Sequence, residues 1–139
     1  MDKIKLSKAA IQMREQVDDH FPGRDRKSDG WLGDYRHATR ESDHNPDAAG
    51  WVRAIDIDAD LGPKGQMAYL ADQIRSAARK DGRISYVIFN GRIASPRLGW
   101  RWRRYNGASS HQHHCHVSFK KTADNDGRFF QIPMLGGHE

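Results

Sequence analysis

Four of the chain's eight histidines lie in one short run, residues 111–116 (HQHHCH). A purification tag or a disordered metal-binding tract has the same composition. However, the run leads directly into residues 117–119 (VSF), which have the β-branched and aromatic composition of a strand. Because side chains alternate along a strand, His114 and His116 are predicted to share one face with Ser118. The opposite face then carries Cys115, Val117 and Phe119 and is predicted to belong to the core. An ordered His-x-His pair is one half of a metal site.

The other half is expected upstream, since a catalytic zinc ion typically has three protein ligands and one position open to water. His44 lies in the polar stretch SDHNP, and residues 52–58 alternate as a strand that carries Asp56 and Asp58 on one face. A carboxylate on a half-buried strand costs free energy unless it is paired or binds a metal. Both aspartates are candidates on this pattern, and an ordinary edge strand with charged side chains also fits it.

Taken together, these segments resemble the signature of the zinc peptidases that include lysostaphin, D-alanyl-D-alanine carboxypeptidases and the hedgehog signalling domain. The matching motifs are Ser42-x-His44, Ala54-x-Asp56 and His114-x-His116, in this order. The likeness is strongest to the branch of D-Ala-D-Ala carboxypeptidases and L-alanyl-D-glutamate endopeptidases, including phage endolysin domains. It extends over residues 28–46, 86–95, 99–101 and 114–119. The resemblance implies one peptidase domain over residues 1–139, with Zn²⁺ held by His44, Asp56 and His116.

Two departures from that family affect the expected chemistry. The connection between the first two ligands is longer than usual, which predicts a longer loop over residues 45–50. The carboxypeptidase branch has a glutamate three positions before the last ligand, where this chain has His113. A variant of the wider group uses the first histidine of His-x-His instead, with another histidine three positions earlier. His114 and His111 reproduce that spacing. The resemblance therefore implies that His114 handles the proton and that His111 orients His114 or assists with the oxyanion. A solvated loop histidine is the alternative for His111.

Four further residues are candidates for substrate contacts. Arg40 and Ser42 precede the first ligand, where the family binds the peptide or carboxylate of its substrate, and a planar guanidinium suits a carboxylate. Trp100 and Tyr105 lie in a segment rich in Trp and Arg that is suited to line a groove. The alternatives are a surface arginine and ordinary packing of the aromatic rings.

The elements that position these residues follow from hydrophobic periodicity. Helices are predicted over residues 6–20 and from residues 61–63 to a stop at Gly82. Strands are predicted over residues 52–58, 84–89, 92–94 and 114–119, with Asn90-Gly91 as a hairpin turn. Residues 24–50 and 99–110 are predicted loops, and the tail after residue 121 is weakly patterned. The predicted class is α+β, a small and mainly antiparallel sheet that carries the zinc site, with two or more helices packed on it.

Composition and charge limit the function classes. The chain has 139 residues, of which 37% are hydrophobic and 29% charged, as expected for one folded domain. Its single cysteine excludes an internal disulfide and a four-cysteine zinc site. No apolar run approaches the ~20 residues that span a bilayer, and the N-terminal residues lack the apolar stretch of a signal peptide. We therefore expect synthesis in the host cytoplasm and no membrane insertion.

The formal net charge of +5 suits an anionic partner, although a solubilising excess of charge is an equal alternative. With the resemblance, it implies a monomeric zinc peptidase that cuts the peptide part of peptidoglycan. A phage lysis enzyme acting on the cell wall after release, or a component of a phage particle, is expected. The scissile bond is open between L-Ala–D-Glu, a cross-bridge and the terminal D-Ala–D-Ala. The alternatives are a metal-dependent nuclease and a non-catalytic module that binds zinc and cell wall. Nucleic acid is not expected as a partner, because residues 114–119 lack the helix of the nuclease motif.

Overall fold

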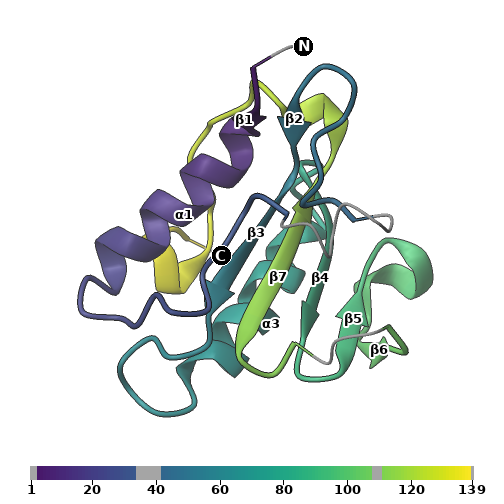
Figure 1. The fold of residues 1–139 in the computed structure, drawn as a ribbon. Coiled ribbons are helices and arrows are strands. Elements are labelled where there is room, and N and C mark those ends of the chain that lie inside the picture. The colour runs from purple at the N-terminus through teal and green to yellow at the C-terminus, as the bar shows by residue number, and fades with distance from the viewer. Residues whose placement is uncertain (1–2, 34–41, 108–110, 139) are drawn as a thin grey trace.

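A five-stranded antiparallel sheet forms the centre of the fold (Figure 1). The computed structural model describes residues 3–33, 42–107 and 111–138. The strands are β3 (Ala54–Asp58), β4 (Ile84–Phe89), β5 (Arg92–Ala94), β6 (Arg103–Arg104) and β7 (His114–Phe119), in the spatial order β3-β7-β4-β5-β6. Because β7 inserts between β3 and β4, the histidine run lies directly beside the strand that carries Asp56.

The predicted strand over residues 52–58 is divided between two sheets. Its first part is β2 (Trp51–Val52), which pairs in parallel with β1 (Lys5–Leu6), and its second part is β3. Arg53 stands between them, with its guanidinium bound to Asp47 and Asp124. The prediction of one continuous strand was therefore wrong at Arg53, where the chain passes from one sheet to the other.

In the described part of the chain, two helices pack on the sheet, α1 (Lys8–His20) and α3 (Gln66–Ala78). Figure 1 shows α3 behind the sheet, where it contacts β4, whereas α1 lies on the β3 side. Both helices begin later than predicted, because Leu6 pairs in β1 and because Gly62 and Gly65 have positive φ angles of 114° and 79°. The left-handed backbone at these glycines delays the start of α3. Helices and a mainly antiparallel sheet confirm the predicted α+β class.

The hairpin between β4 and β5 matches its prediction. Asn90 and Gly91 have φ angles of 51° and 76°, as a tight turn between twisted strands requires. The segment after β5 was predicted as a loop from residue 99 onwards. Its described residues include the 3₁₀ turn η1 (Arg97–Trp100) and the short strand β6. A strand of two residues is too short to show alternation in the sequence.

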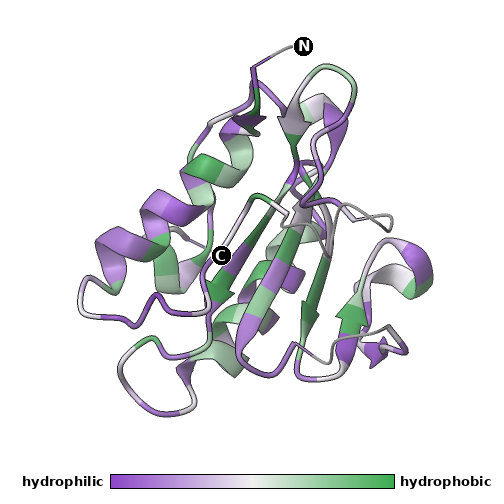
Figure 2. Ribbon diagram, in the orientation of Figure 1, coloured by the Kyte–Doolittle hydropathy of each residue, from purple (hydrophilic) through white to green (hydrophobic). Residues whose placement is uncertain are grey.

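The weakly patterned tail packs into the core rather than extending from it. It contains the 3₁₀ turns η2 (Lys121–Ala123) and η3 (Pro133–Leu135), and its Phe130, Ile132 and Leu135 are fully buried. The side-chain amide of Gln16 in α1 donates to the carbonyls of Phe130 and Leu135. Figure 2 shows hydrophobic residues along β4 and an alternation of hydrophobic and hydrophilic residues along β7. No helix in the described part of the chain is long and apolar enough to cross a bilayer.

Candidate metal centre

Three potential ligands converge where β3 and β7 meet the loop before β2. Asp56 and His116 are directly opposite each other in the antiparallel ladder, and His44 approaches from the loop. His44 Nε2 lies 3.1 Å from Asp56 Oδ2, His116 Nδ1 lies 3.1 Å from Asp56 Oδ1, and the two nitrogens are 3.2 Å apart. These three residues, hereafter the ligand trio, could hold a metal ion.

The separations within the ligand trio agree with a single shared cation. Metal–ligand bonds of about 2.0–2.1 Å place neighbouring ligand atoms about 3.3–3.4 Å apart around a tetrahedral ion. Around an octahedral ion of similar bond length, adjacent ligands are about 3.0 Å apart. The observed 3.1–3.2 Å lies between these values. The geometry therefore fits three ligands on one ion and does not by itself select the metal.

The neighbouring histidines keep Asp56 in the ionised form that a metal needs. Burial raises the pKa of Asp56, but the hydrogen bonds and charges of His116 and His44 outweigh it, so the pKa ends far below its usual value. Both histidines are buried, with 5% of His44 and 4% of His116 exposed. The carboxylate therefore stays ionised at neutral pH and its negative charge is available to a cation.

Hydrogen bonds outside the trio orient both imidazoles. His44 donates its Nδ1–H to the carbonyl oxygen of Trp31 (2.9 Å), which can only accept. His116 donates its Nε2–H to Ser118 Oγ (2.7 Å), because the Ser118 hydroxyl donates in turn to Asp43 Oδ2 (2.9 Å). With both histidines in the neutral form that a metal requires, these outer bonds would leave the lone pairs of His44 Nε2 and His116 Nδ1 directed into the trio. Such outer contacts commonly fix the tautomer of metal-binding histidines.

Tyr86 completes this outer layer from the neighbouring strand. It is the register partner of Ser118, its hydroxyl donates to Asp43 Oδ2 at 2.6 Å, and its ring stacks on His116 with an interplanar angle of 13°. Burial and then the hydrogen bond to Asp43 raise the pKa of Tyr86, so the phenol remains a donor. Asp43 and Tyr86 were not among the site residues predicted from the sequence. Asp43 is adjacent to a predicted ligand, but nothing in a single sequence indicates that β4 brings Tyr86 to the same place.

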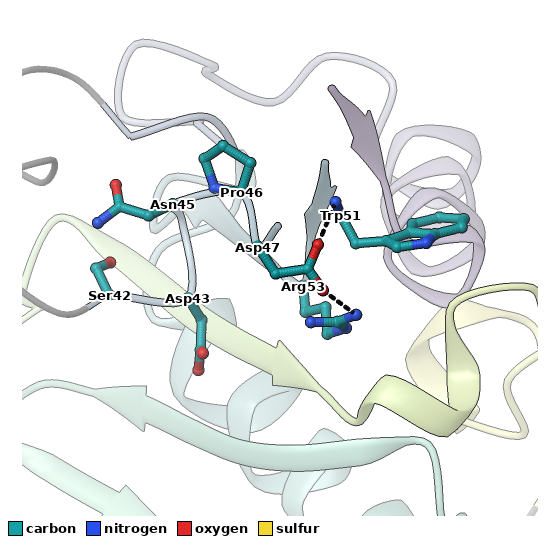
Figure 3. A pocket seen from close by; sticks show the side chains of 7 residues that line it. All are labelled: Ser42, Asp43, Asn45, Pro46, Asp47, Trp51 and Arg53. Atoms are coloured by element: carbon teal, nitrogen blue, oxygen red, sulfur yellow. Dashed lines mark hydrogen bonds and ion pairs between the residues drawn. The ribbon is translucent and has the colours of Figure 1, made fainter. Parts of the chain in front are cut away.

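A compact turn holds the loop that carries His44. The carboxylate of Asp47 accepts the backbone N–H groups of Ala49 and Trp51 and binds the guanidinium of Arg53. Asp47, Trp51 and Arg53 line a pocket of about 330 Å³. Figure 3 shows Ser42 and Asp43 on its opposite side. The predicted longer loop over residues 45–50 is thus a turn closed by its own side chains, and the Arg53 backbone N–H also donates to the Asp43 carbonyl.

Two more histidines lie against the trio. His114 Nε2 is 3.6 Å from Asp56 Oδ1, and the rings of His111 and His114 meet edge-on with centroids 4.9 Å apart. Burial is the largest influence on the pKa of His114 and lowers it, against the attraction of Asp56. A neutral His114 at neutral pH has a lone pair able to accept a proton. His113, by contrast, is exposed and precedes β7, and its backbone carbonyl accepts the Ala59 N–H.

The comparisons with known proteins found no relative. No family model matches the chain, and no curated protein or solved structure matches it either. The resemblance to the zinc peptidases thus rests on the motifs alone, and the geometry of the trio is independent of it.

The two aspartates of β3 have different surroundings. Asp56 belongs to the ligand trio, whereas Asp58 accepts the backbone N–H of Ser28 through Oδ2 and that of Asp60 through Oδ1, both at 2.8 Å. The Asp58 carboxylate thus stabilises the turn at the end of β3. Of the two aspartates that the sequence offered as ligands, the structure places only Asp56 in the ligand trio.

The residues predicted to contact substrate are placed differently from one another. Arg40 lies outside the described residues. The Ser42 hydroxyl accepts the His44 backbone N–H at 3.2 Å and also lines the pocket. Tyr105 lies beside the site, since its ring meets the His111 ring at 5.6 Å. Trp100 is packed into the hydrophobic core with 8% of its surface exposed. This environment agrees with the alternative given for Trp100, ordinary packing of the aromatic ring.

Proposed function

We propose that the protein is a zinc-dependent peptidase that hydrolyses an amide bond in the peptide part of bacterial peptidoglycan. The observation that carries the proposal is the ligand trio with His114 beside it. Two imidazoles and one carboxylate are a common ligand set of catalytic zinc, which leaves a fourth position for water or substrate. Zinc bound there would acidify a water molecule and polarise the substrate carbonyl.

The residues of the chain then have separate roles. His44, Asp56 and His116 bind the ion, and the contacts of His44 with Trp31 and of His116 with Ser118 keep both rings in place. His114 accepts a proton at Nε2, the atom that faces Asp56, and returns it to the leaving amine. His111 packs edge-on against His114 and restricts its ring.

Peptidoglycan as substrate is supported by three observations. The sequence motifs resemble those of enzymes that cut this polymer, and the net charge of +5 favours adsorption to an anionic cell wall. The pocket beside Ser42 and Asp43 adjoins the ligand loop and offers polar groups to a peptide. The nuclease alternative receives no such support, because β7 is followed by the 3₁₀ turn η2 rather than by a helix.

The test is digestion of purified peptidoglycan by the zinc-loaded protein, with the products identified by mass spectrometry. We expect new peptide ends at one type of amide bond, and their identity names that bond. The same digestion with the His114→Ala variant and with chelator-treated protein provides the controls. Intact peptidoglycan after incubation with fully zinc-loaded wild type would contradict the proposal, and cleavage of plasmid DNA instead would favour the nuclease.

A further inference from the structure

A second group of potential ligands adjoins the ligand trio and shares one residue with it. Asp56, His111 and His114 offer ligand atoms that all lie within 4.8 Å of one another. Asp56 Oδ2 lies 3.1 Å from His44 Nε2, whereas Asp56 Oδ1 lies 3.1 Å from His116 Nδ1 and 3.6 Å from His114 Nε2. A carboxylate in this position is able to bridge two cations, as in sites where two metal ions lie about 3.5–4 Å apart.

The position of His111 is held by the backbone around it. Its φ angle is 56°, an uncommon value for a residue other than glycine, and its carbonyl accepts the backbone N–H of Asn90 at 2.9 Å. The tight turn at Asn90 thus anchors the loop before β7. The His111 ring consequently packs against those of His114 and His116, with centroids 4.9 Å and 5.5 Å away.

The dimensions of this second group indicate a weaker site than the trio. Two ligands on one ion with bonds of about 2.1 Å are at most about 4.2 Å apart, and about 3.4 Å apart in a tetrahedron. In the second group Asp56 Oδ1 lies 3.6 Å from His114 Nε2, against 3.1–3.2 Å between neighbouring ligand atoms of the trio, so its members must move closer before they share an ion. Both histidines are only partly buried, so a cation can reach them from solvent. A neighbouring cation in the trio also repels a second one.

We infer that Asp56, His111 and His114 form a second, lower-affinity zinc site that fills after the first. Filling it occupies the Nε2 lone pair of His114. If the proposed function holds, the second ion takes away the residue that accepts the proton, and excess zinc inhibits the enzyme. Zinc would then be both the cofactor and a regulator of the same site.

The test is a calorimetric titration of the metal-free protein with Zn²⁺. Wild type is expected to bind one equivalent tightly and a second at least 10-fold more weakly. His111→Asn is the main variant, because asparagine tolerates a positive φ angle. His114→Gln is the second variant, and both should keep the first equivalent and lose the second. His113→Ala removes an exposed neighbouring histidine and should bind as wild type does.

Three results would overturn the inference. The first is that wild type binds a single equivalent up to millimolar zinc. The second is that either variant retains the second equivalent. The third is that both variants lose both equivalents, which would make the two groups one site. The titration needs no substrate, so it decides the second site even if the protein proves inactive on peptidoglycan. With an active protein, hydrolysis should fall at least 10-fold as the second equivalent fills, and unchanged hydrolysis would overturn the regulatory part.

Discussion

The two faces of β7 come from alternate residues of one six-residue strand, yet they meet different requirements. On the core face, Cys115 and Val117 have no exposed surface and contact apolar neighbours. On the site face, His116 and Ser118 are just as buried, but each hydrogen bonds to a particular partner. Apolar packing tolerates substitution by a similar shape, whereas a directed polar contact fails when one partner is lost. Substitutions on the two faces should therefore have effects of different kinds.

The largest contrast is expected between neighbours in the strand, His116 and Val117. His116→Ala should abolish tight zinc binding and with it the rise in melting temperature that zinc confers on wild type, since a ligand stabilises the state that binds it. Val117→Ala should keep one zinc per chain and lower the free energy of unfolding by about 2 kcal/mol through the cavity it leaves. Zinc content by mass spectrometry and thermal melts with and without zinc check both. A full equivalent of tightly bound zinc in His116→Ala would break the contrast.

The next effect separates catalysis from metal binding on the site face. His114→Ala should retain zinc at the trio and lose at least ~100-fold in turnover, as expected when one general acid–base group is removed. His113→Ala, the matched control, should lose far less. Zinc content is measured first, so that lost metal is not mistaken for lost catalysis.

The reverse result would relocate the proton-handling residue. If His113→Ala is inactive while His114→Ala turns over normally, His113 occupies the position of the family's glutamate. The assignment of functions to the face of β7 would then be off by one residue.

A smaller effect is expected from the outer layer. Ser118→Ala removes the acceptor of the His116 Nε2–H and should weaken zinc binding by about 10–100-fold without abolishing it. Ser95→Ala is the control, because the Ser95 hydroxyl accepts from Arg103 on the β5–β6 side of the sheet, away from β3 and β7. Zinc affinity by competition with a chromophoric chelator measures both. Equal affinities of Ser118→Ala and wild type would show that the tautomer of His116 does not depend on Ser118.

The smallest effect concerns the charged surface. If net positive charge holds the protein on the cell wall, adsorption should weaken when salt rises to about 0.5 M, because exposed charges are screened over a Debye length of ~3–10 Å in this range. A sedimentation assay with purified cell walls measures the bound fraction, and the zinc content of the bound protein should stay constant. Adsorption that does not respond to salt would point to the aromatic side chains near the site instead.

Local patterns were sufficient to predict β4, β5 and β7, because each has a clear composition and a turn or loop on either side. The same alternation correctly predicted which face of β7 belongs to the core, and burial raises the pKa of the Cys115 thiol as expected for an inert core residue. The ligand trio was predicted from motifs, and its close approach follows from the insertion of β7 beside β3.

Features that depend on distant segments could not be predicted. The tail after residue 121 has no periodicity, and its place in the core depends on contacts such as those of Gln16 with Phe130. The strand pattern alone left Asp56 and Asp58 open, and the resemblance to the zinc peptidases favoured Asp56. The backbone N–H groups that occupy Asp58 come from the loops and could not be predicted. The roles of Asp43 and Tyr86 depend on strand order, which no local pattern contains.

The central claim is that His44, Asp56 and His116 hold one metal ion, and anomalous diffraction at the zinc edge tests it most directly. Crystals of the protein loaded with one equivalent of zinc should show a single peak at about 2.0–2.2 Å from His44 Nε2, His116 Nδ1 and an Asp56 oxygen. A peak at Asp58, a peak at an exposed histidine such as His113, or no peak at the trio would contradict the account.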